Sequence, residues 1–393
     1  MINNFFNNKL GIVIGGSGLI GGGSINFFEK KWGCRILAPN SKKLSLRNAD
    51  DIQAFFQRYH PDFIINTAIA AIDSDPEVTF EVNYLGNINL AKVAMSFNIP
   101  YIFFSSAAVL PDGNNLDEES SMLPLSVGLS NYAKSKVMSE LTLQHLHKTK
   151  GLDYTIIRLA IAYGKYDHKI QGFHRLLFSI ADQSMPLLFT GKNICHSYSN
   201  TKKTQYFLRH VLENRDEFSG HTYHFVDPEP VNLSQLILTI RALLGVQTSR
   251  EFYIPFPMAR FGMKILEKII KGLHKFGIES RMPPELMFLE NFYRTHTLSA
   301  DKLQRSSFVD PAPDETVFNR LPEIIEYYLT RWQHFNLMSL GDDFFDSKKF
   351  TNDFLNSPKK LLDEIHQQKC QPFRDFQPQQ DIKKDIDISS LPY

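Results

Sequence analysis

The sequence has few cysteines and no long apolar run. Its three cysteines, Cys34, Cys195 and Cys370, are odd in number and widely spaced, and none forms a Cys-x-x-Cys pair. They therefore indicate neither a disulfide framework nor a zinc site, and a reducing compartment fits. The sequence contains no stretch of about 18 uninterrupted apolar residues, so it predicts no membrane-spanning helix. Residues 1–9 lack a basic stretch followed by a cleavable apolar core, so we expect a soluble, cytoplasmic protein.

An excess of charge of either sign is also missing. The chain has 43 basic and 42 acidic side chains, a formal net charge of +1, so no broad basic surface suggests a nucleic-acid partner. Histidines in a metal-binding pattern are absent as well: His145 and His147 are two residues apart and would point to different sides of a helix. The Cys195-His196 pair has no further ligands nearby. We predict no metal site.

The sequence does contain apolar runs that alternate with helical patterns. With 393 residues and 43% hydrophobic residues, the chain can bury a large core and exceeds the usual length of one domain. Strands are expected at 10–14, 34–38, 63–66, 101–104, 154–157 and 223–226, and helices at 24–31, 51–59, 78–97 and 233–244. This alternation predicts an α/β fold with a doubly wound parallel sheet of the Rossmann type, covered by helices on both faces.

Three regions are expected along the chain. Residues 1–164 would form the dinucleotide-binding domain, and residues 165–331 a smaller, mixed substrate lobe interleaved with the main sheet. Residues 332–393 would form a C-terminal extension. Part of it, residues 367–380, is rich in glutamine with two prolines, which is typical of a linker or a poorly ordered tail.

A glycine turn lies where the first expected strand leads into a helix. Gly15, Gly18 and Gly21 have the spacing in which the first glycine permits the turn, the second admits a pyrophosphate and the third lets helix and strand pack closely. The amides at the helix start would then face the phosphates. Such strings are often only flexible loops, but the preceding strand and the following alternation favour a dinucleotide site.

The end of the second expected strand bears on the choice of cofactor. NAD preference usually depends on a carboxylate about 20 residues beyond the turn, but residues 38–43 read Ala-Pro-Asn-Ser-Lys-Lys. Lys42, Lys43 or Arg47 would suit the 2′-phosphate of NADP. The alternative is that the lysines are simply solvated. NADP is favoured and NAD stays an alternative.

A tyrosine and a lysine four residues apart suggest the chemistry. Tyr132 and Lys136 would lie on one face of a helix. A phenol, with its ordinary pKa near 10, moves a proton at neutral pH only when a cation stabilises its anion, which Lys136 would do while also holding the cofactor ribose. Ser106 would hold the substrate oxygen, with Ser105 as an alternative. Asn83 would anchor a proton relay or merely tie neighbouring backbones.

Together these elements resemble the extended short-chain dehydrogenases/reductases, the NAD-dependent epimerase/dehydratase family. The resemblance covers about residues 9–330, and it rests on Ile14-Gly15-x-x-Gly18-x-x-Gly21, Asn66-Thr-Ala68, Asn83, Ser105-Ser106, Tyr132-x-x-x-Lys136 with Ser135 and Glu140, and Arg158 to Gly164. It implies catalytic roles for Ser106, Tyr132 and Lys136, with Asn83 as a further candidate. The cofactor contacts expected are Gly15, Ser17, Gly18, Leu19, Ile20, Gly21, Lys42, Ser45, Ala68 and Lys136.

Departures from the family pattern narrow the reaction. Many members have Val-Tyr-Gly after the serine, whereas Val109-Leu-Pro-Asp-Gly113 here is closer to the Val-Phe-Asp-Gly of dTDP-4-dehydrorhamnose reductases. Sugar 4,6-dehydratases have an Asp-Glu pair directly after the catalytic hydroxyl, where this chain has Ala107-Ala108. Dehydration is therefore disfavoured.

Three functions stay open. The first is reduction or epimerisation of a nucleotide-linked sugar, with Tyr163-Gly164 and residues 171–177 bordering the substrate cleft. The second is reduction of a hydrophobic acyl or sterol-like substrate at a membrane surface, because residues 255–278 have a basic amphipathic pattern; an ordinary lobe helix would have the same pattern. The third is a catalytically silent, NADP-binding regulator. Dimerisation through the helix of Tyr132 is a further expectation from the resemblance.

Overall fold

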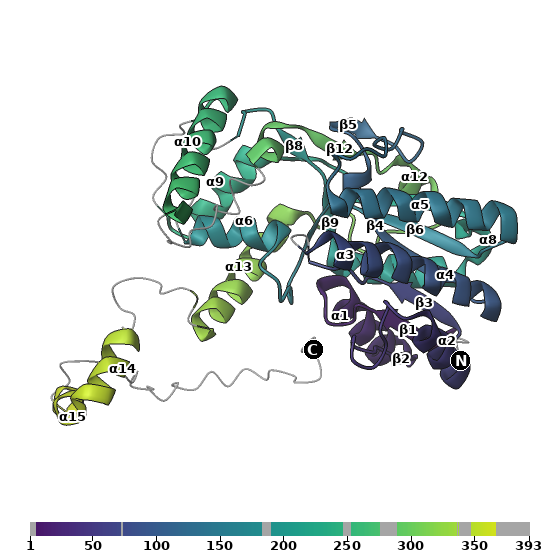
Figure 1. Ribbon diagram of the computed structural model, residues 1–393, viewed down its shortest axis with the longest axis horizontal. Helices are drawn as coiled ribbons and strands as arrows, with labels where there is room; N and C mark the ends of the chain where they lie inside the picture. Colours follow the sequence, from purple (N-terminus) through teal and green to yellow (C-terminus); the bar gives the residue numbers. More distant parts are fainter. Residues whose placement is uncertain are drawn as a thin grey trace. The chain divides into compact units, whose positions relative to one another are not determined.

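The chain divides into two compact units, each described by itself. The computed structural model describes residues 5–71, 74–182, 190–246, 253–275, 289–335, 337 and 347–366. The units are Met1–Leu329 and Thr330–Tyr393 (Figure 1). The second contains α14 (Ser347–Asn356) and α15 (Pro358–His366), and the linker-like segment 367–380 lies outside the described residues. None of the described helices is long and apolar enough to cross a membrane.

A six-stranded parallel sheet forms the centre of the first unit. Its order is β10-β6-β4-β3-β1-β2, and each neighbouring pair is parallel. The strands are β1 (Leu10–Ile14), β2 (Arg35–Leu37), β3 (Phe63–Asn66), β4 (Tyr101–Ser106), β6 (Tyr154–Leu159) and β10 (His221–Phe225). The strand order reverses between β1 and β3, and in sheets of this kind ligands bind in a crevice at the C-terminal ends of the two strands where the order reverses.

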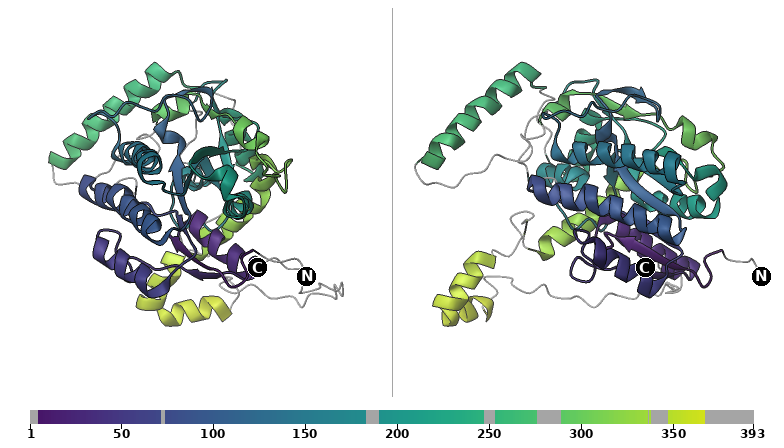
Figure 2. Two further views of the ribbon diagram at one scale, coloured as in Figure 1. Left: turned by 90° about the vertical axis from the view of Figure 1, so that its right-hand side faces the viewer. Right: turned by 45° about the vertical axis from the view of Figure 1, so that its right-hand side comes forward.

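Helices cover both faces of this sheet, as the alternating pattern predicts (Figure 2). Consecutive residues of β1 point to opposite faces: Val13 belongs to one buried apolar cluster, and Ile12 and Ile14 to another. The first cluster includes α7, and the second includes α2 and α4. The elements of this layer are α1 (Leu19–Asn26), η1 (Phe27–Lys31), α2 (Ala49–Tyr59), α3 (Pro76–Thr79), η2 (Phe80–Leu85), α4 (Gly86–Phe97), α5 (Asn131–Lys150), α7 (Thr201–Glu213) and α8 (Arg215–Phe218).

Two smaller sheets lie beyond the main one. A mixed four-stranded sheet has the order β11-β8-β12-β5, and β7 pairs with β9 in parallel. Their strands are β5 (Gly113–Leu116), β7 (Ile161–Tyr163), β8 (Cys195–His196), β9 (Tyr198–Asn200), β11 (Val231–Asn232) and β12 (His296–Leu298). The remaining helices among the described residues up to His334 are η3 (Ala107–Val109), α6 (Gly172–Ala181), α9 (Leu233–Leu243), α10 (Phe256–Lys275), η4 (Leu289–Tyr293), α12 (Asp301–Arg305) and α13 (Val317–His334).

One boundary from the sequence was wrong. The first helix begins at Leu19, not at Ser24, with Gly18 as its N-cap. Successive glycines lower helix propensity, which is why the pattern favoured a later start. Close packing explains them, because a Cβ on Gly21 would lie 2.4 Å from the carbonyl oxygen of Gly15. The helical run 76–97 also contains a π-helical turn, η2, for which the sequence offers no signal.

The contact at Gly21 gives a stability prediction. Gly21→Ala should lower the free energy of unfolding by about 3 kcal/mol, because the new methyl group meets backbone atoms that cannot move aside. Gly128→Ala is the matched control, since nothing lies within 4 Å of its Cβ position. Urea unfolding measures both variants, and equal stabilities would contradict the packing described for the turn.

Candidate active site

The glycine turn connects β1 to α1 at the crevice. Gly15 has a φ of +85°, a conformation that disfavours side chains, and its carbonyl oxygen accepts a hydrogen bond of 2.9 Å from the Gly18 amide. Ser17 and Gly18 are exposed, and Leu19 and Ile20 are half-buried. The turn thus leaves backbone open beside the N-terminus of a helix, a cradle suited to a dinucleotide pyrophosphate.

The end of β3 lies against this turn. A Cβ on Gly15 would be 2.7 Å from the amide nitrogen of Ala68, so the predicted contact residues Gly15 and Ala68 are neighbours. Asn66 fixes this corner: its Oδ1 accepts from the Ala68 amide at 3.1 Å, and its Nδ2 donates to the Tyr101 hydroxyl at 2.7 Å. The Tyr101 hydroxyl in turn donates to Asn87 Oδ1. The supporting roles of Tyr101 and Asn87 were missed, because nothing in their spacing marks this contact.

The helix α5 holds the predicted proton donor and its cation. Ser130 caps the helix by accepting from the Ala133 amide at 3.2 Å, which places Tyr132 in the first turn and Lys136 one turn later. The Lys136 ammonium is 6.0 Å from the centre of the Tyr132 ring and donates to the Phe104 carbonyl at 2.7 Å.

Burial shifts the pKa values of both groups. Lys136 is only 4% exposed, and this desolvation lowers its pKa to about 8, although the Glu140 carboxylate acts in the opposite direction. Burial also raises the pKa of Tyr132, while a hydrogen bond with the Ser106 hydroxyl lowers it. The phenol is therefore protonated near neutral pH unless a further charge or donor stabilises its anion.

Ser106, not Ser105, faces the tyrosine. It is the last residue of β4, and its Oγ accepts from the Ala108 amide at 3.2 Å and lies in hydrogen-bonding reach of the Tyr132 phenol. Ser105 is 5% exposed, and its Oγ has no hydrogen-bond partner among the described residues. Successive strand residues point to opposite faces, so only one of the two serines can point toward Tyr132.

Asn83 is buried in the π-helical turn η2, below α5. Its Oδ1 accepts from the Ala70 amide at 2.7 Å, and its Nδ2 donates to Ser135 Oγ at 3.5 Å. Ser135 Oγ itself donates to the Tyr132 carbonyl at 2.8 Å. These contacts tie three segments together behind the tyrosine. Of the two roles considered for Asn83, a proton relay and the tying of neighbouring backbones, they correspond to the second.

A buried ion pair lies one turn further along α5. Arg158 donates to both Glu140 oxygens, with Nη2 2.7 Å from Oε2, and the two side chains are 2% and 0% exposed. The Arg158 guanidinium also lies 3.2 Å from His224 Nε2. Burial, and to a smaller extent this guanidinium, lower the pKa of His224 to about 3. The pair places a buried carboxylate one helical turn from Lys136 on α5.

The turn after β2 has cations and no carboxylate. Asn40 Oδ1 accepts from the amides of Lys42 and Lys43, both at 3.1 Å, and the two lysine side chains are exposed. Arg47 instead forms an ion pair of 2.5 Å with Glu81. Ser45 Oγ accepts from the Arg47 amide at 3.3 Å. Of the three predicted cations, Lys42 and Lys43 are therefore the ones not engaged in this ion pair.

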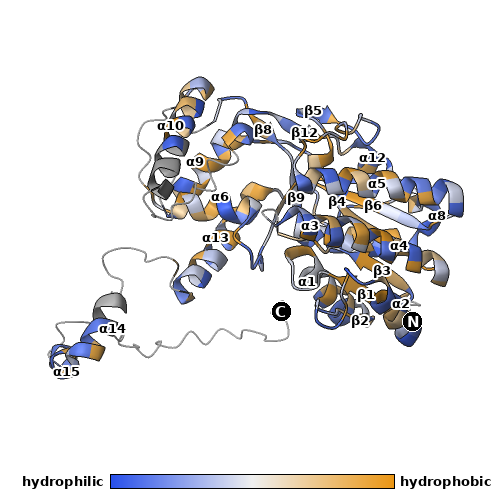
Figure 3. Ribbon diagram, in the orientation of Figure 1, coloured by the Kyte–Doolittle hydropathy of each residue, from blue (hydrophilic) through white to orange (hydrophobic). Residues whose placement is uncertain are grey.

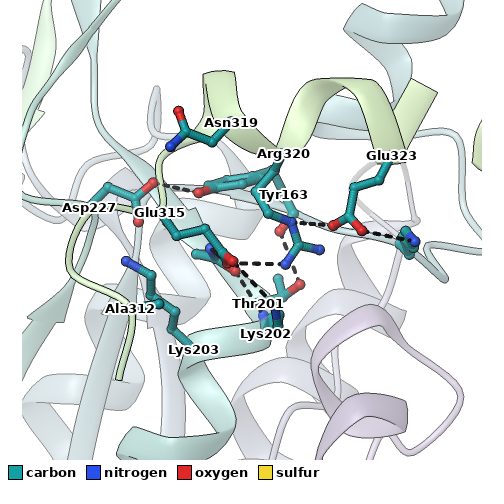
Figure 4. A network of polar contacts seen from close by, with 12 residues as sticks. Tyr163, Thr201, Lys202, Lys203, Asp227, Ala312, Glu315, Asn319, Arg320 and Glu323 are labelled. Carbon is teal, nitrogen blue, oxygen red and sulfur yellow. Dashed lines mark hydrogen bonds and ion pairs between the residues drawn. The ribbon is translucent and has the colours of Figure 1, made fainter. Parts of the chain in front are cut away.

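A second polar network joins the lobe to β7 (Figure 4). The Tyr163 hydroxyl donates to Asp227 at 2.7 Å, and burial raises the pKa of Asp227 to about 6. Arg320 forms two ion pairs, one from Nη1 to Glu315 Oε1 at 3.1 Å and one from Nε to Glu323 Oε1 at 2.5 Å. Glu323 also pairs with Lys165 at 3.1 Å, so the network lies beside Tyr163-Gly164, where the sequence predicts a border of the substrate cleft. Among the described residues no group of three or more His, Cys, Asp or Glu side chains is arranged to hold a metal ion.

Comparison with known proteins agrees with this geometry. Residues 12–194 match the model of the NAD dependent epimerase/dehydratase family. The matched part, just under half of the chain, is similar to that family. The match extends from β1 to the segment before β8, and includes the glycine turn, Ser106, Tyr132 and Lys136. The resemblance inferred from the motifs is thus confirmed, as is the fold class.

Individual relatives differ in what they act on. The chain is 28% identical over 178 residues, 40% of its length, to the decarboxylating sterol-4-alpha-carboxylate 3-dehydrogenase of Schizosaccharomyces pombe, and spans 52% of that protein. It is 20% identical over 270 residues, 67% of its length, to a UDP-glucuronate 4-epimerase of Thermodesulfobacterium geofontis, and spans 80% of it. A GDP-mannoheptose C4 reductase from Campylobacter jejuni, solved with NADP, has a TM-score of 0.62 at 12% identity, covering 82% of this chain and 98% of that one.

The depressed pKa of Lys136 gives a prediction on stability. Its value of about 8 lies below the ordinary 10.5, so folding of the cofactor-free protein is penalised below pH 8, and the penalty fades as the pH rises toward 10.5. Lys136→Met should therefore raise the free energy of unfolding at pH 7 by about 1 to 3 kcal/mol.

Urea unfolding at pH 7 and pH 10 tests this, with Lys134→Met as the control, because Lys134 lies in the same turn and is half-buried. The gain should shrink at the higher pH. A Lys136→Met protein less stable than the wild type at pH 7 would contradict the burial of a charged ammonium.

Proposed function

We propose that this chain is an NADP(H)-dependent oxidoreductase that transfers a hydride at a carbonyl or secondary alcohol of a nucleotide-linked sugar. The observation that carries the proposal is the convergence of the Tyr132 phenol, the Ser106 hydroxyl and the Lys136 ammonium at the edge of the crevice. The similarity of residues 12–194 to the family supports it.

The residues around the crevice fit the cofactor. The turn from Gly15 to Gly21 would hold the pyrophosphate, and Ala68 would lie beside it. Lys42, with Ser45 nearby, would meet the 2′-phosphate of NADP, and the absence of a carboxylate in this turn disfavours the hydrogen bonds that NAD usually receives there. The Lys136 ammonium would exchange the Phe104 carbonyl for the ribose hydroxyls.

The chain's own residues would then handle the proton. The bound nicotinamide supplies or accepts the hydride. In reduction, Ser106 holds the substrate carbonyl oxygen by a hydrogen bond, and Tyr132 gives its proton to that oxygen as the carbon is reduced. Lys136 stabilises the phenolate left behind, because opposite charges at this distance interact strongly in a buried site. Asn83 would hold the first turn of α5 in place.

Reduction is the reaction for which these residues and the nicotinamide cofactor would suffice, with no further catalytic side chain. Ala107 and Ala108 follow Ser106 in η3, where neither side chain can protonate a leaving hydroxyl, so dehydration is not proposed. Epimerisation would use the same hydride step twice, with rotation of the intermediate between the two. The epimerase and the C4 reductase among the similar proteins both support a sugar substrate.

A hydrophobic, sterol-like substrate is the second candidate. It is supported by the similarity to the sterol dehydrogenase and by an exposed apolar stripe on α10. The two candidates separate by binding, because UDP- or dTDP-sugars should stabilise the protein under the first and not under the second. A catalytically silent regulator, the third function, would bind NADP without turnover. A homodimer through α5 stays a prediction.

The central test is Tyr132→Phe. Removing the proton donor should lower the rate of NADPH oxidation with a 4-keto nucleotide sugar by about 10²- to 10⁴-fold, the usual contribution of acid catalysis, while NADPH binding is kept. Tyr59→Phe is the matched control, on the outer side of α2. An unchanged rate in Tyr132→Phe would contradict the proposal, and turnover of sterol substrates alone would favour the second candidate.

Cofactor choice has its own test. Lys42→Ala should raise the KM for NADPH by about tenfold, as expected for the loss of one charged contact with a phosphate, and leave the KM for NADH unchanged. Lys92→Ala, an exposed lysine of α4, is the control. Equal effects on NADPH and NADH would show that Lys42 does not distinguish the two.

A further inference from the structure

The helix α10 has an apolar stripe that is exposed among the residues that the structure describes. Met258, Phe261 and Ile265 are 62%, 67% and 44% exposed. Their spacing of three and four residues places them on one side of the helix. Large apolar side chains are rarely left in water as a contiguous stripe without a partner.

The opposite side of α10 attaches its first turns to the unit. Ala259 is buried, and the ring of Phe256 packs against Tyr293 of η4 with centroids 5.1 Å apart. Tyr293 also donates a hydrogen bond of 2.7 Å to the Ile254 carbonyl. The views in Figures 1 and 2 show α10 extending at the margin of the unit. The exposed stripe is therefore a second apolar face, distinct from the one that anchors the helix.

Cations lie along one edge of the exposed stripe. Arg260, Lys264 and Lys268 are exposed, and at 100° per residue they are adjacent to Met258, Phe261 and Ile265. The sequence of Phe256–Lys275 has five Lys or Arg and one Glu, a net charge of +4 in a chain whose net charge is +1. Figure 3 shows the apolar and polar segments along this helix.

We infer that α10 is a docking helix for the surface of an anionic lipid bilayer. An apolar stripe flanked by Lys and Arg is the arrangement in which side chains enter the acyl boundary while the cations meet lipid phosphates. A second copy of the same face would place two sets of cations near each other, so charge favours a membrane over self-association. This inference concerns where the protein lies and does not rest on the proposed substrate.

Vesicle sedimentation of the full chain tests the inference. The protein should bind phosphatidylcholine vesicles containing about a third phosphatidylserine, and bind pure phosphatidylcholine at least tenfold more weakly. Raising the salt from about 0.1 M to about 1 M should release it, because screening shortens the reach of the charges.

Variants separate the two components of the surface. Lys264→Ala with Lys268→Ala should weaken binding to the anionic vesicles about 25-fold, at about fivefold for each cation, whereas Lys148→Ala with Lys150→Ala on α5 should not. Phe261→Ser should weaken binding about tenfold. Its control is Val127→Ser, which removes an apolar side chain that is 97% exposed. Circular dichroism and the NADPH affinity confirm that each variant is folded.

Two outcomes would overturn the inference. One is equal binding to neutral and anionic vesicles, or none to either. The other is a concentration-dependent oligomer of the wild type that Phe261→Ser dissolves, which would identify the face as an interface between copies. Because NADPH oxidation of sugar substrates is measured without vesicles, the proposed function can fail while this surface is confirmed, and the reverse.

Discussion

The proposed site depends above all on a charged ammonium group held in a place where water hardly reaches it. Lys136 is almost fully buried between α5 and the end of β4, with its one hydrogen bond to a backbone carbonyl. Burial disfavours its charge, and the nearby Glu140 carboxylate, which pairs with Arg158, partly compensates. In the proposed mechanism this cation would stabilise a phenolate at Tyr132, at a cost to the stability of the cofactor-free fold.

Around this cation the fold supplies positions by backbone geometry. The glycine turn, the end of β3 and the end of β4 all lie at the C-terminal edge of one parallel sheet, so residues distant in sequence meet in one crevice. Buried amides such as Asn66 and Asn83 fix the segments between them by bonding to backbone amides. Substrate specificity, in contrast, would come from the lobe, whose sheets draw on segments from residue 113 to residue 298.

Much of the fold could be predicted from the sequence, because apolar periodicity and glycine spacing are properties of short stretches of the chain. The strands at 10–14 and 63–66 agree residue by residue, and the strand predicted at 223–226 lies within one or two residues of β10. Contacts between residues far apart in the sequence could not be predicted. The bond from Lys136 to the Phe104 carbonyl, the contacts of Asn83 and the small sheet that joins β5 to β12 all depend on tertiary packing. The start of the first helix was predicted too late for the same reason, because a close backbone contact, and not local helix propensity, explains the glycine at position 21.

A crystal structure with NADP and a substrate analogue is the most direct test of the proposed site. We expect the pyrophosphate on the turn from Gly15 to Gly21, the ribose hydroxyls on Lys136 and the nicotinamide beside the hydroxyls of Tyr132 and Ser106. A dinucleotide bound elsewhere, or one whose nicotinamide ring lies beyond hydrogen-bonding reach of a substrate oxygen held by Tyr132, would contradict this expectation.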